Sequence, residues 1–142
     1  MAKMKRKVTI PPPAKDLAMV GKYPAFVKAG GGYIFDDVLE YRVWIHPRGG
    51  DDFFQSFGTL EEAKAFAESK RDEGKYAVVE DPLVLVQQKE YINGKCELVR
   101  EERITEWRIE WLFEDTWRTK KNISRAIKRC KIDRVEHPED FK

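Results

Sequence analysis

Apolar and polar side chains alternate most regularly between Val38 and His46, and this alternation predicts a β-strand. One set of alternate residues is expected to face the core, namely Leu39, Tyr41, Val43 and Ile45. A glycine-containing turn at residues 47–51 follows, and a second strand is predicted at Phe53–Phe57. The two strands are therefore expected to pair as a hairpin.

A helix is predicted directly after this hairpin. Thr59 is a typical N-cap residue, and Glu62, three residues later, completes a capping box. Apolar side chains then recur at helical spacing, at Leu60, Ala63, Phe66 and Ala67. Gly74 suits the left-handed conformation that commonly ends a helix. This part of the chain is therefore predicted to form a strand–strand–helix unit.

The following segment predicts a second hairpin. Tyr76–Glu80 has the pattern of a short strand, and two longer strands, Leu83–Ile92 and Lys95–Leu112, flank the turn signal Asn93-Gly94. The simplest register for that turn places Glu90 opposite Glu97, and like charges in that position are unfavourable. It also places Leu85 opposite Glu102. A bulge or a longer loop that shifts the pairing is the alternative.

A second helix is predicted at Thr119–Lys131, with Ile123, Ala126, Ile127 and Cys130 on its apolar side. Residues 1–14 are expected to form an extended basic, proline-containing arm, and residues 133–142 a polar tail. The elements together predict an α+β fold in a single domain, residues 1–142. It would consist of a mainly antiparallel, twisted sheet with two or three helices packed on it.

The charge of the 142-residue chain is unevenly distributed, although 27 Lys and Arg nearly balance 25 Asp and Glu. Residues 1–7 carry a net charge of +4, residues 118–142 carry +5, and the segment between them carries −7. Basic ends on an acidic body favour either contacts between copies of the chain, giving a homo-oligomer, or an anionic partner such as a nucleic acid or an acidic protein. Because no apolar segment follows the basic start, a cytoplasmic location away from membranes is expected.

His46 is the candidate for a catalytic base, because it ends the first strand beside a glycine-containing turn. Tyr41 and Arg48 are the other candidates around it, and whether the protein is an enzyme stays open. Gly30–Gly32 leads into a strand rather than a helix, so it favours a flexible connection over a phosphate cradle.

Cys96 and Cys130 are expected to be free thiols, because two cysteines are too few for a disulfide framework or a thiolate zinc site. No nearby histidine would activate either thiol, so neither is expected to act as a nucleophile. The two histidines do not form a metal site, and no metal is expected.

The second helix is the candidate binding surface. Its basic residues and one just before it are Arg118, Lys120, Lys121, Arg125, Lys128 and Arg129. They could contact the phosphates of a nucleic acid or pair with the acidic body. Trp107, Trp111 and Phe113 are expected to point the same way on their strand, as part of the core, as a platform for stacked bases or as an oligomer interface.

Four sequence blocks resemble a set of small bacterial proteins identified as GCN5-family acetyltransferases: KRKVTIPPP, FVKAGGGYIFDDVLEYRVWIHP, EDPLVLVQQKEYI and REERITEWRIEWL. The resemblance covers about residues 5–112. It implies an N-acetyltransferase, active or degenerate, that uses acetyl-CoA as its cofactor. The cofactor loop of that family, R/Q-x-x-G-x-G/A between a strand and a helix, has its nearest match at Arg48–Asp51, between two predicted strands. The resemblance therefore assigns no catalytic residue.

A second stretch, Tyr41–Ser69, is similar to the ββα units of arm-type DNA-binding domains in recombinases. The sequence thus leaves three functions open: a non-catalytic binding module, an acetyltransferase-like protein and a nucleic-acid-binding protein. The first is favoured, because the sequence shows no nucleophile–base pair, metal-ligand set or phosphate loop.

Overall fold

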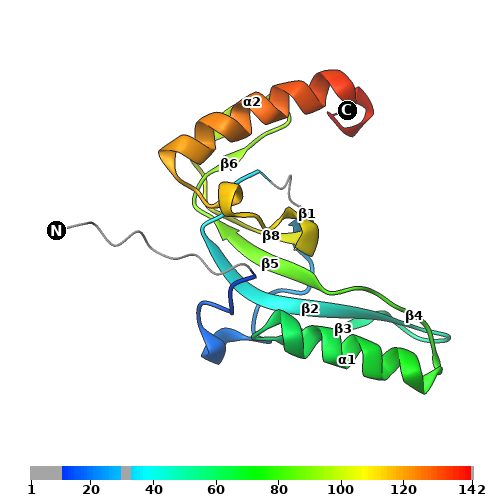
Figure 1. Ribbon diagram of the computed structural model, residues 1–142. Helices are drawn as coiled ribbons and strands as arrows, with labels where there is room; N and C mark the ends of the chain where they lie inside the picture. The colour runs from blue at the N-terminus through cyan, green and yellow to red at the C-terminus, as the bar shows by residue number, and fades with distance from the viewer. Residues whose placement is uncertain (1–10, 30–32, 142) are drawn as a thin grey trace.

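The computed structural model describes residues 11–29 and 33–141 and shows an α+β fold (Figure 1). The main sheet has the strand order β1-β8-β5-β2-β3, with β4 also paired to β2. Every pairing in it is antiparallel except that of β1 with β8. Its strands are β1 (Lys28–Ala29), β2 (Asp37–Pro47), β3 (Phe53–Phe57), β4 (Tyr76–Val79), β5 (Leu83–Gln88) and β8 (Arg103–Arg108). The predicted fold class is confirmed.

The two α-helices of the described chain lie at opposite ends of the molecule (Figure 1). Helix α1 (Leu60–Glu73) runs along β2, β3 and β4, whereas α2 (Lys120–Glu136) lies beside a small ribbon of β6 (Tyr91–Ile92) and β7 (Leu98–Val99). Short 3₁₀ turns complete the chain: η1 (Leu17–Met19), η2 (Ile109–Trp111), η3 (Glu114–Thr116) and η4 (Pro138–Phe141). Within the described part of the chain, neither helix is long and apolar enough to cross a bilayer.

Strand β2 confirms the predicted alternation on one face only. Tyr41, Val43 and Ile45 are buried in the main core. Because the pairing with β5 shifts register between Val38 and Glu40, Val38 rather than Leu39 joins that core. The opposite face of β2 is covered as well, since Glu40 and Arg42 are wholly buried.

The segment that follows the N-terminal prolines explains this second buried face. The Arg42 guanidinium donates hydrogen bonds to the carbonyl oxygens of Pro24 at 2.6 Å and Ala25 at 3.2 Å, and its Nε donates to Glu40 at 2.7 Å. The Glu40 carboxylate also accepts a hydrogen bond from the backbone N–H of Gly21 at 2.8 Å. The buried Glu40–Arg42 ion pair therefore holds residues 21–25 against the sheet. Its hydrogen bonds also satisfy backbone polar groups of that segment.

The start of the described chain is tied to the body rather than standing away from it as an arm. The Tyr41 hydroxyl donates a hydrogen bond to the carbonyl oxygen of Pro12, and the Ala14 N–H donates to that of Gly58 at 2.7 Å. The side chain of Leu17 lies 2.5 Å from the position that a Cβ on Gly58 would occupy. Gly58 is thus required for close packing. Residues 1–10 of the predicted arm and Gly30–Gly32 lie outside the described residues.

Helix α1 begins and ends as predicted. The Thr59 Oγ1 accepts a hydrogen bond from the Glu62 N–H at 3.2 Å, and Gly74 ends the helix with φ +67°. Its buried stripe of Leu60, Ala63 and Ala67 packs on the main core. Local signals were sufficient here, because cap, stripe and terminal glycine all indicate the same helix.

The hairpin around Asn93-Gly94 uses the longer loop rather than the two-residue turn. Tyr91 pairs with Val99, and Leu85 pairs with Glu106 instead of Glu102. The Asn93 side-chain oxygen accepts hydrogen bonds from the N–H groups of Lys95 and Glu97, both at 3.0 Å. The loop is therefore closed by the asparagine side chain. Glu97 belongs to the loop and so is not paired across strands with Glu90.

Several predicted boundaries are wrong. The predicted strand Leu83–Ile92 is interrupted between β5 and β6, and the predicted strand Lys95–Leu112 is interrupted between β7 and β8. The strand expected to reach Leu112 ends at Arg108, where η2 begins, and the Leu112 N–H donates to the Ile109 carbonyl oxygen at 3.0 Å. Helix α2 continues through Asp133 to Glu136, so the expected polar tail starts inside the helix. The Tyr33 hydroxyl donates to the Asp133 carboxylate at 2.8 Å, and this contact holds the extra turn against the body.

The cysteines also differ from the expectation, since Cys96 and Cys130 form a disulfide. Their Cα atoms lie 5.5 Å apart although the residues are 34 positions apart in sequence. The bond joins the 93–97 loop to the apolar side of α2, inside a second core that also contains Ile34, Ile92 and Ala126. Helix periodicity placed Cys130 on the correct side, but only the folded hairpin places Cys96 beside it.

Candidate functional site

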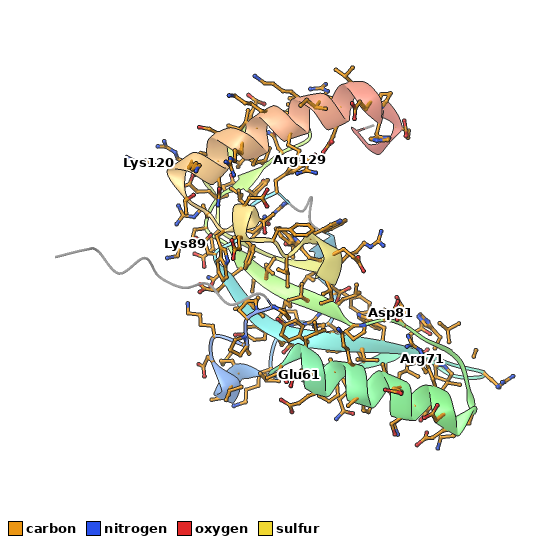
Figure 2. All side chains as sticks on the ribbon, in the orientation of Figure 1. Glu61, Arg71, Asp81, Lys89, Lys120 and Arg129 are labelled. Atoms are coloured by element: carbon orange, nitrogen blue, oxygen red, sulfur yellow. A yellow bond between two sulfur atoms is a disulfide. The ribbon has the colours of Figure 1, made fainter. Side chains whose placement is uncertain are left out.

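A cleft of about 750 Å³ lies between α2 and the segment that follows β8. Arg125, Lys128 and Arg129 line it from the helix, and Trp111 and Phe113 line it from the other side. A neighbouring hollow of about 580 Å³ shares Phe113, Arg125 and Arg129 and adds Lys121. Arg129 lies on the side of α2 that faces the rest of the molecule (Figure 2). This basic–aromatic cleft is the candidate site.

Hydrogen bonds at the start of α2 fix the two walls relative to each other. Thr119 caps the helix by accepting from the Asn122 N–H at 3.1 Å. The Asn122 amide donates to the carbonyl oxygens of Glu114 at 3.2 Å and Trp117 at 2.9 Å. The Thr116 hydroxyl donates to the Phe113 carbonyl oxygen at 2.7 Å. Residues 113–117 and the first turn of α2 therefore form one hydrogen-bonded corner.

The predicted basic residues divide into two groups. Arg118 is engaged inside the protein, because its Nε lies 2.6 Å from Asp36 and its Nη1 lies 3.4 Å from Glu90. The other five are exposed and make no ion pair with any acid in the described chain, namely Lys120, Lys121, Arg125, Lys128 and Arg129. These five cations were expected either to contact phosphates or to pair with the acidic body. Within residues 11–29 and 33–141 they do not pair with it.

The three aromatic residues predicted to share one side of a strand also fall into two groups, one buried and one that lines the cleft. Trp107 is wholly buried in the main core and meets Trp111 edge to face, with ring centroids 6.2 Å apart. Trp111 is only partly buried, and Phe113 is 56% exposed. The three do not share one side of a strand, because β8 ends before Trp111 and the chain turns. Only Trp111 and Phe113 reach the cleft.

Carboxylate side chains also line this cleft. Their presence there was not predicted from the sequence. Asp115 belongs to both hollows, and Asp133 and Glu136 border the larger one. Asp133 already accepts the hydrogen bond from Tyr33. Asp115 and Glu136 form no side-chain hydrogen bond or ion pair with the described residues. The cleft thus combines free cations, the exposed ring of Phe113 and free hydrogen-bond acceptors.

The predicted catalytic candidates are not brought together around one site. The ring nitrogens of His46, whose side chain is one-third exposed, contact two carboxylates: Nε2 lies 2.5 Å from Glu80 and Nδ1 lies 2.9 Å from Asp52. The hydrogen bond to Glu80, and next that to Asp52, raises the pKa of His46 above its ordinary value. Arg48 is exposed in the β2–β3 loop. The imidazole is therefore held as an ion-pairing group between β2, the loop and the end of β4.

Tyr41 lies in the core rather than beside His46, and burial raises the pKa of its hydroxyl. Among the described residues, no group of three or more His, Cys, Asp or Glu side chains is arranged to hold a metal ion. Arg48–Asp51 lies between two strands, as expected. The glycine that does precede a helix after a strand, Gly58, is covered by Leu17, and Glu61 and Glu62 occupy the first turn of that helix.

No protein-family model matches this chain, and no curated protein or solved structure shows significant similarity to it. The resemblance to GCN5-family acetyltransferases accordingly stays a prediction.

Proposed function

We propose that this protein is a non-catalytic binding module that holds an anionic partner in the basic–aromatic cleft. One observation carries the proposal: Arg125 and Arg129 line both hollows and make no ion pair with the described part of the chain. Cationic side chains without an acidic partner in the protein keep a positive electrostatic potential, which attracts an anionic partner. A concave site focuses this electrostatic potential on a ligand that enters it.

The contrast with other arginines of the chain supports this interpretation. Arg42 pairs with Glu40, Arg71 with Asp81 at 2.8 Å, and Arg118 with Asp36. Outside α2, Arg108 also pairs with an acid, Glu110, whereas Arg48, Arg100 and Arg103 make no ion pair with the described chain. Helix α2 carries seven Lys and Arg but only two acids. The acidic body and the basic helix therefore do not cancel each other, and the cations of α2 stay available.

The test is binding of a panel of fluorescent polyanions, followed by anisotropy: a single-stranded oligonucleotide, a duplex and heparin. With about four contacts, from Lys121, Arg125, Lys128 and Arg129, affinity for a single strand should fall about 50-fold between about 50 and about 200 mM salt. The double variant Arg125→Gln/Arg129→Gln should lose affinity, and its log–log salt slope should become shallower by about 1.4.

A matched control removes two exposed cations that lie away from the cleft. Arg48→Gln/Lys64→Gln changes the net charge equally, and neither residue makes an ion pair with the described chain. This control should bind like the unaltered protein. Failure of all three polyanions to bind, or equal losses in both double variants, would refute a site in the cleft.

Acetyl-CoA belongs in the same experiment, because the acetyltransferase alternative rests on the resemblance of the four sequence blocks. Its pyrophosphate is anionic, so weak binding that the Arg125→Gln/Arg129→Gln variant abolishes would support the cleft and not the enzyme. Calorimetric heat at millimolar acetyl-CoA that survives this variant would favour the acetyltransferase instead.

A further inference from the structure

We infer that the anionic partner is a single-stranded nucleic acid, with phosphates on Arg125 and Arg129 and an unpaired base against Phe113. The inference rests on the proposed function and narrows it to one chemical class. Three observations carry it: the mixed charge of the cleft, an exposed ring beside the free cations, and the size of the hollow.

The mixed charge favours a ligand that offers N–H donors beside its anionic groups. Asp115 and Glu136 line the cleft without a side-chain partner in the described chain, alongside Arg125 and Arg129. The sulfates and carboxylates of heparin and the side chains of acidic polypeptides present these two acids with further negative charge. A nucleotide presents a phosphate to the arginines and also base N–H groups, such as cytosine N4 and adenine N6, which carboxylates accept.

The exposed ring of Phe113 is placed where a base can stack on it. Phe113 is 56% exposed and borders both hollows. Hydrogen bonds between Phe113 and Thr116 hold its backbone, so the ring stays at the edge of the cleft. Stacking of a base on an aromatic ring beside a basic groove is the usual basis of single-strand binding.

The size of the hollow favours an unpaired base over a duplex. A volume of about 750 Å³ lies within the range of small-molecule sites and is sufficient for a base with its sugar. In a duplex the bases are stacked and paired, so their faces cannot reach Phe113. A single strand can splay a base into the cleft while its backbone follows the cations of α2.

The experiment compares a mixed-sequence single strand of about 16 nucleotides with its own duplex, heparin and poly-glutamate at one salt concentration. The single strand should bind at least about ten times more tightly than the duplex. Phe113→Ala should weaken single-strand binding about 5- to 100-fold, whereas Phe113→Tyr, which keeps the ring, should restore it. Duplex and heparin binding should respond little to either change. Circular dichroism of both variants should match that of the unaltered protein, since the ring is exposed.

The outcomes separate this inference from the function on which it rests. Equal binding of single strand, duplex and heparin, with no effect of Phe113→Ala, would refute the single-strand assignment and leave an anion site. Tighter binding of poly-glutamate than of any nucleic acid would identify an acidic protein instead. Absence of binding to every probe would refute both proposals.

Discussion

Arg42 lies on the second face of β2, which the alternation in the sequence does not place in the protein interior. Its guanidinium is wholly buried, pairs with Glu40 and Glu106, and stacks on the Phe54 ring at 4.4 Å. From Glu40 onward the alternation in β2 correctly separates two faces, but it contains no information about what covers the second one. The covering segment has no periodic pattern, so its position follows only from these buried contacts.

Substituting Arg42→Met should lower the free energy of unfolding by about 3–5 kcal/mol, because it leaves the Glu40 carboxylate buried without its partner. Urea unfolding followed by tryptophan fluorescence measures the change. The exposed Arg48→Met variant should stay within about 0.5 kcal/mol of the unaltered protein. A similarly small effect at Arg42 would show that the buried pair does not hold the covering segment.

His46 should make stability depend on pH. Its pKa in the folded chain lies above the ordinary 6.5 because the protonated ring bonds to Glu80 and Asp52. The stabilisation is therefore complete below the ordinary pKa and is lost as the pH rises through the raised one. The difference in unfolding free energy between the unaltered protein and His46→Gln should be largest near about pH 6 and should shrink as the pH rises through the raised pKa. A difference that grows with pH would contradict this assignment, and His137→Gln controls for loss of a histidine.

At the scale of elements, the disulfide determines how firmly α2 is held. The bond closes a loop between positions 34 apart, so reduction should lower the free energy of unfolding by about 4 kcal/mol. Urea unfolding with and without dithiothreitol measures this, and thiol titration confirms reduction. The Cys96→Ser/Cys130→Ser variant should be insensitive to the reductant. Equal stability of the oxidised and reduced chains would show that packing alone holds α2.

Elements with strong local signals were predictable from the sequence, and their contacts were not. The cap at Thr59, the glycine at position 74 and the alternation in β2 each specify structure within a few residues. The Cys96–Cys130 bond instead depends on the five-residue loop and the docking of α2. The basic and aromatic halves of the candidate site were both visible in sequence. Their juxtaposition was not, because the turn after Arg108 brings Phe113 to α2.

At the scale of the whole molecule, the cleft lies at the end that carries α2, and α1 lies at the opposite end (Figure 1). A ligand in the cleft should therefore protect lysines at one end only. Acetylation with an amine-reactive ester, read by mass spectrometry, should slow at Lys121 and Lys128 when a single-stranded oligonucleotide is present. Lys64 and Lys75, on α1 and just after it, should react at an unchanged rate. Equal protection at both ends would indicate diffuse charge attraction rather than a site.

The two separate hydrophobic clusters have a further consequence for how the molecule opens. Helix α2 packs with Ile34 and Ile92, whereas β2, β5 and α1 share the other cluster. Such clusters commonly act as distinct cooperative units in amide hydrogen exchange. The amides of α2 should therefore exchange through a partial opening that leaves those of β2 and β5 protected, and an occupied cleft should slow that opening alone.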